Sequence, residues 1–117
     1  MSENWPNGVY QDKILPLLKK GVISSILACR NNIQQTEQHL SHEIYGYDFM
    51  VDTNYNVWLL EVNSSPSMEY SSSITEKYVK EGLANLADIA IEQEKCISGA
   101  PWNFNVGSKI GKFELIY

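Results

Sequence analysis

The chain has 117 residues, about the size of one small domain, and 44% of them are hydrophobic and 20% charged, as in ordinary globular proteins. Its formal net charge of −5 argues against nucleic-acid binding, which needs clustered basic side chains, because only Lys19 and Lys20 adjoin. No stretch of about 18 uncharged apolar residues is present, and the N-terminus lacks the order of a signal peptide. We therefore expect a cytoplasmic protein without nucleic-acid or membrane partners.

The first predicted element is a helix over residues 12–30. Asp12 is a suitable N-cap, and Pro16 falls in the first turn, where proline is tolerated. Gly21 weakens the helix locally by about 1 kcal/mol relative to Ala. The apolar residues recur on one broad stripe, which consists of Ile14, Leu15, Leu18, Val22, Ile26 and Leu27. Residues 31–43 are polar without a sustained period and predict a connecting loop that carries His39 and His42.

The segment from residue 44 to residue 63 predicts a β-hairpin. Two runs rich in Val, Tyr, Phe and Trp, IYGYDFMVD and VWLLEVN, flank the turn TNYN. With the turn centred on residues 54 and 55, opposed residues have position numbers that sum to 109. One face is then apolar and belongs against the core, and it pairs Tyr47 with Val62, Phe49 with Leu60 and Val51 with Trp58.

The other face of the predicted hairpin brings two carboxylates together. Asp48 lies opposite Glu61, and Asn63 follows on the same side. Opposed Cβ atoms lie about 4.5–5.5 Å apart, where two negative charges repel each other unless a proton or a cation intervenes. These side chains offer oxygen ligands that suit Mg²⁺, which takes one or two carboxylates together with substrate phosphates. The pattern indicates a magnesium and nucleotide site, and the alternative is two acids at a solvated sheet edge.

The same register predicts an apolar pair beside the carboxylates. It places Met50 opposite Leu59, and these two side chains could form a floor under an adenine ring. Asp52 falls opposite Val57, at the end of this face. We therefore count Met50 and Leu59 as candidate cofactor-binding residues.

A second helix is predicted from residue 74 to about residue 93. Ser73 and Glu76 have the spacing of a capping box, and Gly99 and Pro101 mark the end of the helical segment. Its apolar stripe consists of Ile74, Tyr78, Leu83, Leu86, Ala87 and Ala90. The final residues, KFELIY, have the composition of a strand.

Residues 45–70, YGYDFMVDTNYNVWLLEVNSSPSMEY, resemble the signature of the tubulin tyrosine ligase-like family. The resemblance extends over nearly the whole chain. It implies an α+β fold in which residues 1–117 form the C-terminal part of an ATP-grasp domain, an antiparallel hairpin packed by flanking helices. It also implies that Asp48, Glu61 and Asn63 are magnesium ligands, that Met50 lines the adenine pocket, and that Lys80 is a basic residue of the nucleotide site.

The resemblance carries an expected activity. Such enzymes are ATP- and Mg²⁺-dependent ligases that join an amino acid to a protein carboxylate through an acyl phosphate. The segments SSSITEK and GKFELIY are most similar to the glycine ligases, which implies tubulin and glycine as partners and a place at the cytoskeleton, in cilia or flagella. A glutamate or tyrosine ligase of the same family, and a non-catalytic nucleotide-binding module, stay open as alternatives.

One part of the family pattern is missing from the sequence. The N-terminal lobe of these ligases, with its phosphate-covering loop and the lysines that contact the α- and β-phosphates, has no counterpart here. We therefore expect this chain to be a fragment of a ligase and to be inactive by itself.

Overall fold

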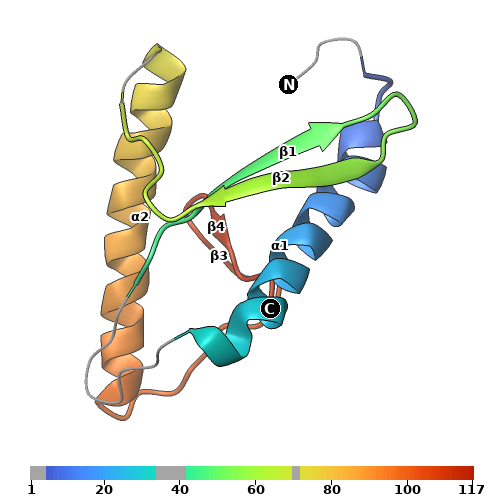
Figure 1. The fold of residues 1–117 in the computed structure, drawn as a ribbon. Coiled ribbons are helices and arrows are strands. Elements are labelled where there is room, and N and C mark those ends of the chain that lie inside the picture. Colours follow the sequence, from blue (N-terminus) through green and yellow to red (C-terminus); the bar gives the residue numbers. More distant parts are fainter. Residues whose placement is uncertain (1–4, 34–41, 70–71) are drawn as a thin grey trace. The chain divides into compact units, whose positions relative to one another are not determined.

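The computed structural model describes residues 5–33, 42–69 and 72–117 (Figure 1). The chain divides into two compact units, the first with described residues 5–33 and 43–66, the second with residues 42, 67–69 and 72–117. Each unit combines helix with a two-stranded antiparallel sheet, so the predicted α+β class is confirmed. Of the helices in these ranges, none has the length and apolar character needed to cross a bilayer.

The first unit begins with a helical segment that is longer than predicted. A π-helical turn, η1 (Tyr10–Ile14), leads into α1 (Leu15–Cys29), and a 3₁₀ turn, η2 (Arg30–Asn32), ends it. The N-cap assignment of Asp12 is wrong: its backbone N–H donates to the Gly8 oxygen at 2.8 Å, so Asp12 lies inside the first turn. Pro16 does occupy the first turn of α1, as predicted.

The hairpin of the first unit consists of β1 (Gly46–Val51) and β2 (Val57–Asn63), and Figure 1 shows it lying across α1. Phe49 approaches the helix at Gly21, where an added Cβ would lie 2.9 Å from the ring. The Tyr47 hydroxyl and the Ser25 hydroxyl are hydrogen-bonded at 2.9 Å. The glycine in mid-helix therefore makes room for an aromatic side chain, and Ile14, which is only 1% exposed, anchors the start of the same helical segment.

The strand register agrees with the prediction in one half of the hairpin and differs in the other. Gly46 pairs with Asn63, Tyr47 with Val62 and Asp48 with Glu61, as predicted, but beyond a β-bulge Phe49 pairs with Leu59, Met50 with Trp58 and Val51 with Val57. The predicted pairs Phe49–Leu60, Val51–Trp58, Met50–Leu59 and Asp52–Val57 are therefore wrong. Leu60 is the extra residue of the bulged strand.

The turn of the hairpin explains this shift, because it spans residues 52–56 and is centred one half-residue earlier than predicted. Asp52 closes the turn through its backbone, which exchanges hydrogen bonds with Tyr55 and Asn56 at 3.0 Å. Tyr55 adopts a left-handed conformation, with φ of 61°. Lys13 fixes the tip to the helical segment, because its ammonium donates to the Asn54 oxygen at 2.8 Å and lies 5.6 Å from the Tyr55 ring centre.

The second unit is built on α2 (Ser73–Ile97), which extends four residues beyond the predicted end. Ser72 is its N-cap and accepts a hydrogen bond from the Thr75 backbone at 3.1 Å, so the predicted capping box of Ser73 and Glu76 is wrong. Gly99, with φ of 104°, follows the helix, as the prediction of a stop at this residue required. His42 bonds to Gln93 of the helix, whereas His39 lies outside the described residues.

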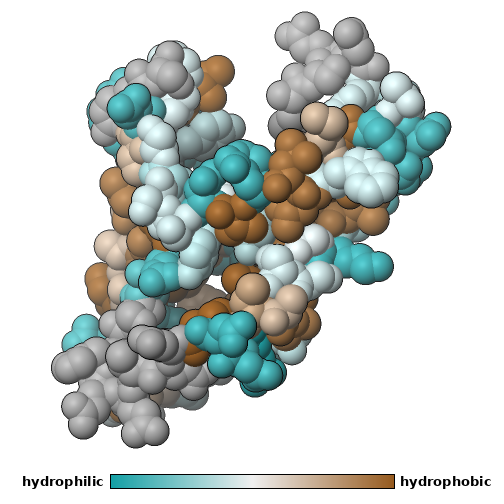
Figure 2. Space-filling model, in the orientation of Figure 1, coloured by the Kyte–Doolittle hydropathy of each residue, from teal (hydrophilic) through white to brown (hydrophobic). Residues whose placement is uncertain are grey.

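The face that α2 buries differs from the predicted stripe. Ile74, Tyr78 and Leu83 are 65%, 59% and 49% exposed, whereas Leu86 and Ala90 are half-buried. The helix carries apolar residues on more than one side, and only part of the predicted stripe is the covered side. Apolar side chains reach the surface in the first unit as well, and Figure 2 shows several such hydrophobic areas.

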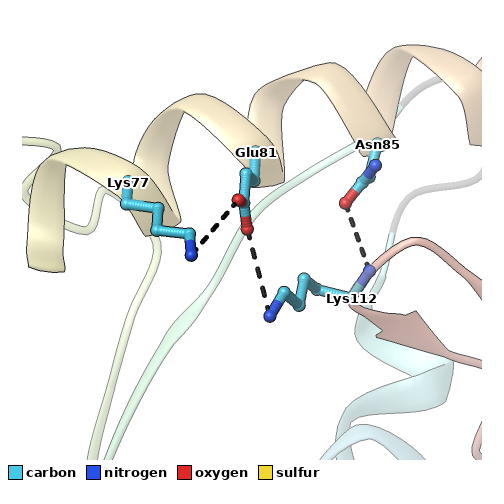
Figure 3. A network of polar contacts seen from close by, with 4 residues as sticks. All are labelled: Lys77, Glu81, Asn85 and Lys112. Atoms are coloured by element: carbon cyan, nitrogen blue, oxygen red, sulfur yellow. Dashed lines mark hydrogen bonds and ion pairs between the residues drawn. The ribbon is translucent and has the colours of Figure 1, made fainter.

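A short hairpin of β3 (Lys109–Ile110) and β4 (Phe113–Glu114) completes the second unit. The predicted C-terminal strand is thus present, but only over two residues. Its turn packs on α2 through Asn85, whose oxygen accepts the Lys112 backbone N–H at 3.2 Å (Figure 3). Glu81 lies between Lys77 and Lys112, 3.9 and 4.0 Å from the two ammonium groups.

Candidate metal and nucleotide site

The candidate site lies on the hairpin face that turns away from the Tyr47 and Phe49 rings. Side chains alternate between the two faces of a strand, so Asp48 points away from α1 when its two neighbours point toward it. Glu61 is the direct partner of Asp48 across the ladder. Both carboxylates are exposed, and directly opposed side chains of like charge repel each other across a hairpin.

Asn63 joins the two carboxylates. Its amide nitrogen donates to Glu61 Oε1 at 3.2 Å and approaches Asp48 Oδ2 at 3.5 Å. The three polar side chains predicted from the sequence are therefore brought together at one end of the ribbon, on one face. The amide offsets part of the repulsion between the two carboxylates, because its N–H groups are the only hydrogen-bond donors among these three side chains.

The residues present fit a magnesium ion. Within residues 5–33, 42–69 and 72–117, no group of three or more His, Cys, Asp and Glu side chains comes together, so no further side chain of these types joins Asp48 and Glu61. The candidate ligand set is therefore two carboxylates and the Asn63 amide. Mg²⁺ sites in proteins use one or two carboxylates and fill the other positions with water and substrate phosphate. A half-turn of the Asn63 amide would present its oxygen in place of its nitrogen, which makes every donor of the set a hard oxygen.

The β-bulge changes the apolar surface beside these residues. Met50 faces Trp58, and both side chains are 57% exposed. Leu59 faces Phe49 and therefore lies on the side of the hairpin that packs on α1. The prediction that Met50 and Leu59 form one floor is wrong, and the apolar neighbour of Met50 on the site face is an indole ring.

The comparison with known families bears on the same segment. The sequence model of the tubulin-tyrosine ligase family matches residues 3–95, which include both strands of the hairpin and most of α2. The chain belongs to the tubulin-tyrosine ligase family. The resemblance that residues 45–70 indicated is thereby confirmed.

The relatives within this family include several tubulin glycylases. The chain is 38% identical over its full length to tubulin glycylase 3B of Tetrahymena thermophila, and 45% identical over 72% of its length to tubulin glycylase 3D of that organism. Tubulin glycylase 3A of Drosophila melanogaster is 26% identical over 93% of the chain. The chain spans 9%, 8% and 10% of these relatives, respectively. No solved structure matches the chain.

Lys80 lies on α2, in the second unit of this tubulin-tyrosine ligase family member. It is exposed and pairs with Glu76 one turn earlier, an arrangement that is common on a solvated helix. Its predicted role at the nucleotide stays a prediction, because Lys80 and the three hairpin residues belong to different units.

The role of Asp52 in the turn of the hairpin went unrecognised in the sequence. Asp52 accepts hydrogen bonds from the backbone of Asn54 and Asn56, from the Asn56 side chain and from the Trp58 indole, at 2.9 to 3.1 Å. The Asn56 side chain first, then Trp58, lowers the pKa of Asp52 to about 2. The pattern of an Asp followed by Asn two residues later is a known signal for this type of turn and could have revealed Asp52.

Proposed function

We propose that this chain supplies the cation- and triphosphate-binding wall of an ATP- and Mg²⁺-dependent ligase that attaches glycine to tubulin. The observation that carries the proposal is the convergence of Asp48, Glu61 and Asn63, with the Asn63 amide reaching toward both carboxylates. Membership of the tubulin-tyrosine ligase family supports a ligase, and the glycylase names of the relatives support glycine and tubulin as its substrates.

The residues of the hairpin have separate tasks in the proposed reaction. Glu61 is the direct cross-strand partner of Asp48 and accepts a hydrogen bond from Asn63, two residues further along β2, so it would be the residue that helps each of the other two to hold a cation. Mg²⁺, when bound, neutralises charge on the β- and γ-phosphates as the γ-phosphoryl group leaves ADP. The carboxylates hold their positions because both lie on paired strands, which limits the reorganisation needed when the triphosphate binds.

The proposed chemistry proceeds in two steps. A tubulin carboxylate attacks the γ-phosphorus of ATP, which breaks the bond to ADP and forms an acyl phosphate. The amine of glycine then attacks the acyl carbon, loses a proton and expels phosphate, which leaves an amide bond. The described hairpin provides the acidic end of this site, and Met50 is its proposed contact with the base. We place the complete enzyme at the cytoskeleton, in cilia or flagella, within the cytoplasm.

The test is a titration of the 117-residue chain with Mn²⁺, a spectroscopic substitute for Mg²⁺, and with Mn·ATP, followed by a glycine ligation assay on tubulin. We expect the chain to bind both, Asp48→Ala to weaken this binding by about 100-fold or more, and no ligation to occur. Equal binding by the wild type and the Asp48→Ala variant would overturn the proposed site. Ligation by the isolated chain that depends on Asp48 would instead overturn the expectation that it is inactive alone. Nucleotide binding without any ligase activity in longer forms of the protein would favour the non-catalytic module.

A further inference from the structure

The second unit contains a cavity of about 200 Å³ between α2 and the C-terminal segment. Its apolar lining comes from the helix, from the loop that follows the helix, and from the β3–β4 hairpin with the residue after it. These apolar lining residues are Ile89, Trp102, Phe104, Ile110, Phe113 and Leu115. The Trp102 and Phe104 rings lie against each other, with their centres 4.9 Å apart. Three separate segments of the chain thus supply apolar walls to one cavity.

The hairpin wall of this cavity is held on α2 by contacts at both of its ends. At the turn, the Lys112 backbone N–H donates to the Asn85 oxygen at 3.2 Å, and the Lys112 ammonium lies 4.0 Å from Glu81 (Figure 3). At the open end of the hairpin, the Leu115 backbone N–H donates to the Ser108 oxygen at 2.9 Å. A ligand therefore meets walls that need little further ordering when it binds.

The size and the lining of the cavity favour an apolar occupant over water. Protein interiors contain few voids larger than one water molecule, which takes up about 30 Å³ in the liquid. This cavity has several times that volume, and most of its lining side chains offer water no hydrogen bond. Apolar cavities of about 150 Å³ hold a molecule of benzene. An occupant of that size would gain contacts with lining side chains that otherwise have no neighbour on this side.

The polar side chains of the lining, Gln93, Ser108 and Glu114, do not form a site for a charged ligand. Gln93 bonds to His42, and the Ser108 hydroxyl accepts the Asn105 backbone N–H at 3.0 Å, so these two groups support the fold. Among the described residues that line the cavity, Glu114 is the one charged side chain, and its carboxylate repels anions. Burying a charge among apolar side chains is costly in any case, so an uncharged ligand fits best.

We infer that this cavity binds a single uncharged aromatic ring, about the size of benzene, with at most a small substituent. Half of the apolar lining side chains are aromatic, and aromatic rings attract one another in offset or edge-to-face arrangements. Trp102 and Phe113 are 49% and 37% exposed, so the cavity can be reached from solvent. A concave and mostly apolar surface with few polar groups is typical of small-molecule sites. The inference does not rest on the proposed function, since the cavity belongs to the second unit and Asp48, Glu61 and Asn63 belong to the first.

The experiment titrates the 117-residue chain with 4-bromophenol at neutral pH, where this probe is uncharged. In a Trp5→Phe, Trp58→Phe background, Trp102 is the only indole of the chain, and bromine quenches indole emission on contact. We expect saturable quenching with a dissociation constant of about 0.1–1 mM, the range expected for so small a ligand. The anion 4-bromobenzoate, which has a similar size, should bind at least about tenfold more weakly.

Two substitutions of Ile89 test the size of the cavity. Ile89→Phe fills it and should weaken 4-bromophenol binding at least about tenfold. The matched control is Ile91→Phe, at a 51% exposed position of the same helix outside the lining of this cavity, and it should leave the affinity unchanged. Ile89→Ala enlarges the cavity and should bind 6-bromo-2-naphthol more tightly than the unsubstituted cavity does. Circular dichroism checks the fold of each variant, and the Ile89→Ala result decides if Ile89→Phe does not fold.

Quenching that rises linearly with 4-bromophenol, as for free N-acetyltryptophanamide, would overturn the inference. Equal binding by the Ile89→Phe and Ile91→Phe variants, equal affinities for 4-bromophenol and 4-bromobenzoate, or no gain in naphthol binding by Ile89→Ala would overturn it as well. These results leave Mn²⁺ binding at Asp48 and Glu61 unaffected, so the inference and the proposed function fail separately.

Discussion

The two ends of the β1–β2 hairpin each carry an aspartate, and the two aspartates have different surroundings. Asp52, at the turn, accepts four hydrogen bonds from fixed protein donors, and its pKa falls to about 2. Asp48, at the open end, faces Glu61, and the hydrogen bonds that the structure records for these two carboxylates come from the single amide of Asn63. Asp52 thus accepts hydrogen bonds from several donors at the turn, whereas Asp48 and its partner share a single amide donor at the open end.

This difference separates a structural carboxylate from a ligand. A carboxylate whose lone pairs are already taken by backbone and side-chain donors has nothing left to offer a cation, and it stabilises the turn instead. Two opposed carboxylates that share one donor keep several lone pairs and repel each other, so a cation stabilises them. The donors around an acid, rather than its exposure, therefore indicate its role in this hairpin.

The largest expected effect follows from removing a carboxylate at the open end. Asp48→Ala should weaken Mn²⁺ binding by about 100-fold or more. Removing a side chain that only supports a metal ligand already lowers metal affinity by about 10- to 100-fold, and removing a ligand itself should cost at least the upper value. The control is Asp88→Ala, which removes an exposed carboxylate of α2. Electron paramagnetic resonance of free Mn²⁺ measures both affinities. Equal losses in the two variants would mean that general negative charge, and not this pair, attracts the cation.

The next effect concerns the contact that holds the hairpin on α1. Gly21→Ala should destabilise the protein by about 1–3 kcal/mol, because the new methyl group would lie 2.9 Å from the Phe49 ring. Gly82→Ala is the matched control in mid-α2, where nothing lies within 4 Å of the added Cβ, and it should stabilise by up to about 1 kcal/mol. Urea unfolding measures both. Two changes of the same sign would contradict the close packing of Phe49 on Gly21.

A smaller effect should appear as a pH dependence of stability. The pKa of Asp52 in the folded protein, about 2, lies below its ordinary value of 3.8. Asp52 therefore stabilises the fold fully above pH 3.8, and this contribution is lost as the pH falls toward 2. The Asp52→Asn variant should lack this contribution, so the thermal unfolding temperatures of the variant and the wild type should converge as the pH falls from 5 to 2. Parallel profiles would show that the turn does not depend on the charge.

The sequence predicted the open end of the hairpin and failed at the tip for an identifiable reason. Asp48 lies opposite Glu61 as predicted because two differences cancel at this end: the turn is centred half a residue earlier than expected, which shifts the partners by one residue, and the bulge shifts them back by one. The bulge inserts Leu60 next to Leu59, and two adjacent leucines give no sign of which one is extra. All pairs between the bulge and the turn therefore shifted by one residue, which exchanged the faces of Leu59 and Trp58.

Similar ambiguities account for the other differences. Three consecutive serines, residues 71–73, run up to the first residue of α2, and each could supply the capping hydroxyl, so the sequence could not distinguish Ser72 from Ser73. The covered side of α2 was misjudged because Ile and Ala residues occur around most of that helix. The α+β class and the existence of the hairpin and both helices were predictable, since they depend on whole segments. The ATP-grasp assignment and the binding of Mg²⁺ and ATP stay predictions.

The smallest expected effect tests the repulsion at the open end directly. Glu61→Gln keeps an oxygen that can accept from Asn63 but removes one of the two opposed charges. Without divalent cations it should stabilise the protein by about 0.2–1 kcal/mol, and the gain should shrink at high salt, where charges are screened. Urea unfolding in the presence of a chelator measures it. The same substitution should weaken Mn²⁺ binding.

The control for this last prediction is Glu92→Gln on α2, which loses an ion pair with Lys95 at 2.7 Å instead of a repulsion. This substitution should be neutral or should destabilise the protein by up to about 0.5 kcal/mol, because an exposed helical ion pair usually contributes no more than this to stability. Opposite signs for two exposed Glu→Gln changes would show that the protein tolerates a local loss of stability at Glu61. A site that is less stable empty than filled is expected where the side chains are arranged for a ligand rather than for the fold. Destabilisation by Glu61→Gln in the metal-free protein would show instead that the pair is already balanced by the protein alone.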